Sequence, residues 1–320
     1  MLPTVIDVYE ARRRLGTRVP KTPLLPSSWL SSVADGNVFL KIESLNLTNS
    51  FKIRGALNAA LHLSEGIDAT ATVVAASAGN HGRALALAAE ELGIPCVIFT
   101  PATAPEAKQS AIRRHGAVLH VCEDYDAAEK QAKVYAEANG ALYISPYNNS
   151  DVIAGAGTIG LEIVEAMPAV EVVVVPLGGG GLASGIGLAI KAAAPHATIV
   201  GVEVAASTPF TLSLAAGRIT EITPQLSLAD GLVGNLEAGA MTFTLVKQVV
   251  DRVVTITEDE LARAMTGLAM EERLIVEGAG AAAAAAVMAG KVSTPGQQVI
   301  AMVTGGNVDL AKWLATINDC

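Results

Sequence analysis

From about residue 70 to the C-terminus, short apolar runs alternate with stretches of helical periodicity. The shorter predicted strands are 72–77, 95–100, 117–121 and 141–145, and the predicted helices between them are 80–93, 104–116 and 124–140. Longer elements follow, with strands at 170–176, 197–204, 251–257 and 298–303, and helices at 151–167, 182–194, 258–273 and after Glu277. Strands joined through helices run parallel, because each helix returns the chain to the edge where the previous strand began. The sequence therefore predicts an α/β fold with two doubly wound, mainly parallel sheets.

The same pattern predicts two domains, for which 320 residues are enough. The run of short strands and helices predicts a small α/β domain at 71–148. A further apolar strand, 37–43, precedes this domain. We therefore expect the large domain to be discontinuous and to comprise 1–70 and 149–320. The segment 205–250 has scattered glycine and proline and is predicted to be irregular.

Composition narrows the class of protein. The chain is 51% hydrophobic but only 4% aromatic, which is typical of a core built from Ala, Val, Ile and Leu. A net charge of -9 argues against a nucleic-acid partner. The cysteines Cys96, Cys122 and Cys320 are scattered without metal-ligand spacing and indicate a reducing compartment. The sequence has no secretory leader pattern and no apolar run of about 18 residues, so we expect no membrane partner and a cytoplasmic protein.

Four short segments at the ends of predicted elements carry candidate chemistry. In the first, Lys52 opens a predicted helix after a loop, where its amine can form a Schiff base with a carbonyl cofactor. The second, Ser77-Ala78-Gly79-Asn80-His81, follows a strand, and backbone N–H groups at such a turn can hold a carboxylate. The alternatives are a surface lysine that begins a helix and an ordinary N-cap.

The third segment, Gly178-Gly179-Gly180-Gly181, joins a buried strand to a helix. Its N–H groups form a nest open to a phosphate, whereas a plain turn needs only one or two glycines. The dinucleotide fingerprint is absent, because Ala183 occupies its sixth place and no acidic residue follows about twenty residues on, which disfavours a nicotinamide oxidoreductase. In the fourth segment, Thr304 follows the last strand, where its hydroxyl can meet a ring nitrogen or form a simple turn.

In order and spacing, the segments SFKIRGA, SAGNHG, GGGGL and TGGN resemble those of the fold-type II pyridoxal 5′-phosphate (PLP) enzymes, whose fold is like the β subunit of tryptophan synthase. They are most similar to the serine/threonine dehydratase and serine racemase group, over nearly the whole chain. The resemblance implies a PLP cofactor and a homodimer. It also implies the cofactor contacts, namely Lys52 as the Schiff-base lysine, Phe51 against the ring, Asn80 at the 3′-oxygen, Gly178, Gly179, Gly180 and Gly181 at the phosphate, Thr304 at the ring nitrogen, and Gly231 and Glu277 nearby.

The same resemblance implies a site for a small amino-acid substrate. The residues that resemble the substrate-carboxylate loop are Ser77, Ala78, Gly79, Asn80 and His81. Lys52 is then the base for the α-proton, and Ser77 and the cofactor phosphate are the candidate acids for the leaving hydroxyl. An alternative for Glu277 is a structural pair with Arg273, one turn back. We expect no metal, because Pro209 stands where the second carboxylate of a racemase-like metal site, beside Glu203, belongs.

Within the group, position 78 favours a lyase. Racemases of the group have a second serine there, which serves the other face of Cα, whereas Ala78 has no proton to give. We therefore expect a dehydratase (ammonia-lyase) that converts L-threonine or L-serine to a 2-oxo acid and ammonia. The alternatives are a dehydratase of a bulkier 3-hydroxy amino acid (phenylserine or hydroxyaspartate type), an amino-acid racemase, and a binding protein without turnover. Glu129 stands where some relatives have Arg, which argues against a second substrate carboxylate.

Overall fold

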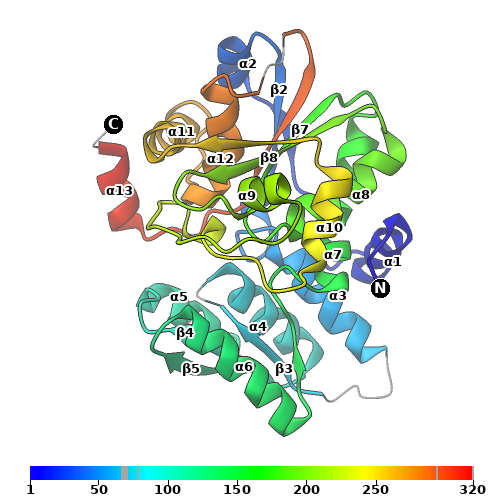
Figure 1. The fold of residues 1–320 in the computed structure, drawn as a ribbon, viewed down its shortest axis with the longest axis vertical. Coiled ribbons are helices and arrows are strands. Elements are labelled where there is room, and N and C mark those ends of the chain that lie inside the picture. The colour runs from blue at the N-terminus through cyan, green and yellow to red at the C-terminus, as the bar shows by residue number, and fades with distance from the viewer. Residues whose placement is uncertain (66–70, 78, 293–294, 319–320) are drawn as a thin grey trace.

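The computed structural model describes residues 1–65, 71–77, 79–292 and 295–318, which fold around two sheets (Figure 1). The strand order is β5-β4-β3-β6 in one sheet and β1-β2-β10-β7-β8-β9 in the other. All pairings are parallel except that of β1 with β2. The predicted α/β class with two mainly parallel sheets is confirmed. The strands are β1 (Leu24–Pro26), β2 (Asn37–Ile42), β3 (Val73–Ala76), β4 (Cys96–Pro101), β5 (Val118–Cys122), β6 (Leu142–Tyr143), β7 (Val172–Pro176), β8 (Thr198–Val204), β9 (Arg252–Ile256) and β10 (Gln298–Val303).

At least one helix lies between each pair of successive strands. They are α1 (Val5–Leu15), α2 (Ser28–Ala34), α3 (Lys52–Ser64), α4 (Asn80–Leu92), α5 (Glu106–Arg113), α6 (Tyr125–Asn139), α7 (Ser150–Ala166), α8 (Gly181–Ala193), α9 (Pro209–Ala216), α10 (Met241–Val249), α11 (Glu258–Met270), α12 (Gly278–Met288) and α13 (Leu310–Asn318), with 3-10 turns η1 (Glu43–Leu45) and η2 (Asp230–Leu232). Among the described residues, no helix is both long enough and apolar enough to cross a membrane.

The small sheet, β3 to β6, packs helices on both of its faces. Side chains alternate along a strand, so Val73 and Ala75 point to one face while Val74 and Ala76 point to the other. The first face packs against α3 and α4, and the second packs against α6. All four strands lie within 71–148, the range predicted for the small domain; the boundaries of the two domains stay a prediction.

In the large sheet, right-handed crossovers decide the face on which each helix lies. The chain moves in one direction along the sheet from β7 through α8 to β8, and in the opposite direction from β9 through α11 and α12 to β10. As a result, α8 and α12 cover opposite faces. The run Ala281–Ala286 in α12 is fully buried, and these small side chains let the helix approach the strands closely.

The structure also contains elements that the hydrophobic pattern does not predict. The N-terminal segment forms α1, which begins with a capping box between Thr4 and Asp7. β1 adds an antiparallel edge to the large sheet. β6 is shorter than the predicted strand 141–145, because Ser145 turns away and donates to the carboxylate of Glu237. This turn lies just past the carboxyl end of β6. Three of the predicted site segments likewise follow the carboxyl ends of strands, namely β3, β7 and β10.

Candidate active site

Lys52 is the first residue of α3, as predicted, and its backbone is tied to the end of β10. The N–H of Phe51 donates to the carbonyl of Thr304 (3.0 Å), and the N–H of Gly306 donates to the carbonyl of Asn49 (2.9 Å). Asn49 has a left-handed backbone with φ 55°, which asparagine tolerates. Backbone hydrogen bonds therefore join two of the four predicted segments, SFKIRGA and TGGN.

The Lys52 side chain is half-buried and points toward the loop after β6. Its Nζ donates to the carbonyl of Pro146 (2.7 Å) and lies 5.1 Å from the centre of the Phe51 ring. Burial lowers the pKa of Lys52 to about 8, and the nearby carboxylate of Glu277 opposes this shift only in part. The amine is thus held in a site that favours its neutral form more than water does.

The four-glycine loop follows β7 and leads directly into α8. Within the described part of the chain, the backbone N–H groups of Gly178, Gly179, Gly180 and Gly181 donate no hydrogen bond. Gly180 has φ 86°, a conformation that favours glycine. A Cβ at Gly179 would lie 2.3 Å from Cγ of Tyr147, so only glycine fits against this ring. Tyr147 follows Pro146, which brings the glycine loop close to the Lys52 amine.

This loop fits the phosphate of the expected cofactor. Gly180 and Gly181 are buried, and a buried N–H without a partner is costly, so these donors fit an anion. A Cβ at Gly180 would lie 3.1 Å from Cβ of Thr242, whose buried hydroxyl has no partner in the described residues. The hydroxyl of Ser184, one turn into α8, is likewise buried without a partner. Unpaired donors and hydroxyls at one helix N-terminus are the polar groups that a phosphate requires.

The second segment forms the turn between β3 and α4. Oγ of Ser77 accepts from the N–H groups of Gly79 (3.2 Å) and Gly82 (2.9 Å), which shapes the turn. Burial and the nearby Lys52 lower the pKa of His81 to about 3, so its ring is neutral. Nε2 of His81 therefore donates to the carbonyl of Ile144 (2.9 Å). The predicted contact of Ala78 lies outside the described residues.

Glu277, at the N-cap of α12, joins this turn to the elements around the large sheet. The Nδ2 of Asn80 donates to Oε1 of Glu277 (2.5 Å), and Oδ1 of Asn80 accepts from Nδ2 of Asn307 (2.7 Å). Burial raises the pKa of Glu277 to about 7, and the carboxylate of Asp230 adds to the shift. Glu277 therefore has Asn80 as its partner, and Arg273, the alternative, donates instead to the carbonyl of Met270.

The remaining predicted residues, Thr304 and Gly231, pack close to Ala279 and to the glycine loop. Oγ1 of Thr304 donates to the carbonyl of Ala279 (3.2 Å). A Cβ at Gly231 would contact the side chain of Ala279 at 3.4 Å, and a Cβ at Gly178 would lie 3.3 Å from the carbonyl of Gly231. Apart from Ala78, the structure thus brings the predicted site residues together, although their individual roles stay predictions.

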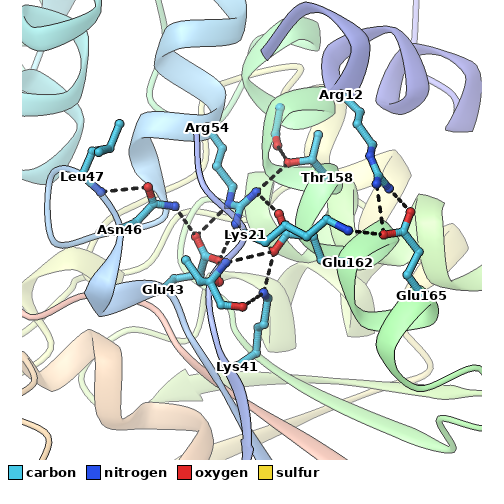
Figure 2. Close-up of polar contacts among 12 residues, drawn as sticks. Arg12, Lys21, Lys41, Glu43, Asn46, Leu47, Arg54, Thr158, Glu162 and Glu165 are labelled. Carbon is cyan, nitrogen blue, oxygen red and sulfur yellow. Dashed lines mark hydrogen bonds and ion pairs between the residues drawn. The ribbon is translucent and has the colours of Figure 1, made fainter. Parts of the chain in front are cut away.

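A buried charge cluster holds the other side of α3 (Figure 2). Arg54 donates to Glu43 on η1 (2.8 Å) and to Glu162 on α7 (2.6 Å), and Lys41 on β2 also pairs with Glu162 (2.6 Å). Burial opposes both charges of the central pair, but mutual attraction outweighs it, lowering the pKa of Glu43 and raising that of Arg54. These contacts fix the position and rotation of the helix that begins with Lys52.

Several residues of the site were not predicted. Pro146, Tyr147 and Asn307 contact predicted residues, and only Asn307 has a sequence signal, as the last residue of TGGN. Where a racemase-like metal site would lie, Glu203 accepts from the N–H groups of Phe210 and Thr211 and so caps α9. Among the described residues, no three His, Cys, Asp or Glu side chains are grouped to hold a metal ion.

Comparison with known proteins gives consistent matches over most of the chain. A family model described as "Pyridoxal-phosphate dependent enzyme" matches residues 16–305. An L-threonine ammonia-lyase from Thermotoga maritima is 44% identical over 308 residues, which are 96% of this chain and 76% of the relative. A putative threonine dehydratase from Sinorhizobium fredii is 40% identical, over 98% of this chain and 94% of the relative.

Solved structures agree in fold. Maize serine racemase superposes with a TM-score of 0.93 at 31% sequence identity, over 100% of this chain and 98% of the other. Threonine deaminase isoform 2 from Solanum lycopersicum superposes with a TM-score of 0.89 at 30% identity, over 98% of this chain and 91% of the other. The fold is thus shared by racemases and deaminases, so the fold alone does not separate these two reactions.

Proposed function

This chain belongs to the family of pyridoxal-phosphate dependent enzymes, and from that premise we propose that it is a lyase of the L-threonine/L-serine ammonia-lyase type. The reaction removes the β-hydroxyl and the α-amino group of a 3-hydroxy amino acid and yields a 2-oxo acid and ammonia. The observation that carries the proposal is the half-buried Lys52 amine, which donates to the carbonyl of Pro146. The next residue, Tyr147, packs its ring against Gly179 of the glycine loop.

The sequence relatives and one residue favour elimination over racemisation. The relatives named for threonine ammonia-lyase or dehydratase are 39% to 44% identical to this chain. The solved structures do not separate the two reactions, because serine racemases are 31% and 33% identical and threonine deaminases 30% and 34%. In the sequence, Ala78 offers no second acid–base group. These observations together support the lyase.

Residues of this chain bind the cofactor and the substrate and transfer protons. Bound pyridoxal phosphate supplies an electron sink for the charge that develops at Cα. Lys52, whose pKa is about 8, is partly neutral near neutral pH and removes the α-proton. The N–H groups of the glycine loop hold the phosphate, and the turn at Ser77 holds the substrate carboxylate. The Ser77 oxygen accepts two N–H groups, and its own hydrogen is available to protonate the leaving hydroxyl.

We also propose a homodimer in the cytoplasm. The dimer is supported by exposed apolar side chains along β1, η1 and the loop before α12, with exposed fractions of 51% for Leu25, 60% for Leu45 and 51% for Ile275. A cytoplasmic location is supported by the buried free thiols of Cys96 and Cys122. Sedimentation of the holoenzyme tests the dimer, and a monomer at micromolar concentration would contradict it.

A substrate panel tests the reaction. The holoenzyme is given L-threonine, L-serine, phenylserine and hydroxyaspartate, and the release of 2-oxo acid and ammonia is measured together with the formation of D-amino acid. We expect stoichiometric 2-oxo acid and ammonia from threonine or serine, and no product from Lys52→Ala. Formation of D-serine from L-serine at the same rate as pyruvate would contradict the lyase assignment, and turnover limited to phenylserine or hydroxyaspartate would move it to the bulkier substrates.

A further inference from the structure

Lys108 on α5 reaches over the turn that is assigned to the substrate carboxylate. If Gly79 carried a Cβ, the three nearest atoms would all belong to Lys108, with Cδ at 3.4 Å, Nζ at 3.6 Å and Cε at 3.8 Å. The lysine side chain is only 20% exposed. An ammonium group therefore lies beside the backbone of the turn, although Lys108 is distant from Gly79 along the chain.

The partner of this ammonium is Asp230, at the start of η2. Nζ of Lys108 pairs with Oδ2 of Asp230 at 2.6 Å, and the Asp230 side chain is 60% exposed. Asp230 opens η2, and the next residue, Gly231, packs against Gly178 of the phosphate loop. The ion pair thus spans from the substrate turn to the cofactor loop. A pocket of about 120 Å³ opens beside it, lined by Gly79, Asn80 and Lys108 among others.

The turn itself lacks a positive charge for a bound carboxylate. His81 is neutral, because its pKa is lowered to about 3. Asn80 is engaged with Glu277 and Asn307. Arg83, one turn further along α4, donates to Oδ1 of Asn307 (2.6 Å). Arg83 and Arg114 also line the pocket, but the three atoms nearest to a Cβ at Gly79 all belong to Lys108, which is therefore the cation placed to neutralise an anion at this position.

We infer that Lys108 is a substrate-binding residue whose ammonium holds the α-carboxylate of the amino acid, and that Asp230 holds this ammonium until the substrate displaces it. The inference rests on the proposed function, since it places the substrate carboxylate at the Gly79 turn. It predicts opposite effects for the two members of the ion pair. Loss of Lys108 removes the attraction, whereas loss of the Asp230 charge removes a competitor for the same ammonium.

The test compares KM and kcat of holoenzyme variants with L-threonine and L-serine. We expect Lys108→Met to raise KM by about tenfold or more, the effect of losing one charge-assisted hydrogen bond, with kcat changed by less than about threefold. Lys108→Arg keeps the charge and is expected to restore most of the affinity. Asp230→Asn is expected to leave KM unchanged or lower it. The matched control is Arg113→Gln, which breaks the Arg113–Glu106 pair on the same helix and leaves KM unchanged.

A second measurement separates binding from a purely structural role. L-threonine amide lacks the negative charge, so its inhibition constant is expected to be the same in Lys108→Met and in the wild type. The inference is overturned if KM rises in Asp230→Asn as it does in Lys108→Met, or if the amide loses as much affinity as threonine. It is also overturned if KM is unchanged in Lys108→Met. Failure of the proposed function would look different, because the wild-type enzyme would then release no 2-oxo acid.

Discussion

The two sides of helix α3 differ in how the charged side chains on them are paired. Arg54 has a side chain that is 2% exposed, and it bonds to Glu43 and Glu162, which are 0% and 9% exposed. Two residues earlier, Lys52 has only a carbonyl as its hydrogen-bond partner within the described ranges, and its pKa is lowered to about 8. On the first side, the Arg54 cation is paired with carboxylates and so is compensated. On the second side, the Lys52 ammonium lies where burial disfavours its charged form and so is uncompensated.

The same contrast extends to the surroundings of the two residues. The cluster around Arg54 forms hydrogen bonds throughout, and Lys41 adds a second cation for its two carboxylates. Around Lys52, Glu277 has a raised pKa, and the N–H groups of the glycine loop have no partner among the described residues. The compensated side fixes the helix, and the uncompensated side is ready for ligands that supply the missing charges.

The largest effect is expected on the uncompensated side, from Lys52→Ala. Removal of the amine removes both the cofactor link and the base, so 2-oxo acid release is expected to fall by about a thousandfold or more. The visible absorption band of the purified protein is expected to disappear. Stability measured by urea unfolding of the apoprotein is expected to stay the same or rise, because a cation whose charged form is disfavoured by burial is removed. Retained activity would remove Lys52 from the mechanism.

On the compensated side, Arg54→Met is expected to cost stability rather than chemistry. The change leaves Glu43 and Glu162 buried with one cation between them, and breaking a buried pair in this way costs about 3–5 kcal/mol. Urea unfolding of the apoprotein measures this loss. The control, Arg263→Met, removes an exposed pair with Asp259 and is expected to cost less than about 1 kcal/mol. Equal losses in the two variants would contradict the contrast between the regions.

A smaller effect is expected from Glu277→Gln, and it depends on pH. The pKa of Glu277 is raised from 4.5 to about 7, so the folded protein binds more protons than the unfolded chain between these values. The free energy of unfolding therefore falls as pH rises through this window, by roughly 3 kcal/mol for this group alone. In Glu277→Gln this fall is absent. Lys52 acts in a separate window, because its lowered pKa makes stability rise between about 8 and 10.5.

The measurement for Glu277 is urea unfolding of the apoprotein at about pH 5 and about pH 8. The control, Glu137→Gln, removes an exposed glutamate on α6 and is expected to keep the wild-type pH dependence. A wild-type pH dependence in Glu277→Gln would show that other groups cause it.

The smallest effect is expected from Thr242→Val beside the glycine loop. The buried hydroxyl of Thr242 has no partner in the described residues, so its removal is expected to change apoprotein stability by less than about 1 kcal/mol, or to raise it. Cofactor affinity is expected to fall by a few-fold if the hydroxyl serves the phosphate, and equilibrium titration with pyridoxal phosphate measures it. A large loss of apoprotein stability would mean that the hydroxyl already has a structural role.

The sequence predicts the fold and the four segments of the site because both depend on local patterns. The periods of strands and helices are visible within about ten residues. Lys52 and Gly180 both lie at the N-terminus of a helix, a position that the local sequence also indicates. The partners of these residues are distant. The bond from Lys52 to Pro146 joins residues 94 apart, and the bond from Lys108 to Asp230 joins residues 122 apart. Such contacts depend on how the two sheets meet, which no local pattern encodes. The charge cluster around Arg54 was missed for the same reason.

The pairing of β2 with β10 sets the order in which the molecule can be assembled on the ribosome. Asn37 lies opposite Gln298 and Ile42 opposite Val303, so this N-terminal strand has no neighbour on that side until almost the whole chain has been synthesised. The small sheet needs only residues up to Tyr143 and can form much earlier. The backbone just before Lys52 is tied to Thr304, at the end of β10. A chain whose translation stops before β10 therefore lacks the backbone hydrogen bonds that place Lys52 at the site.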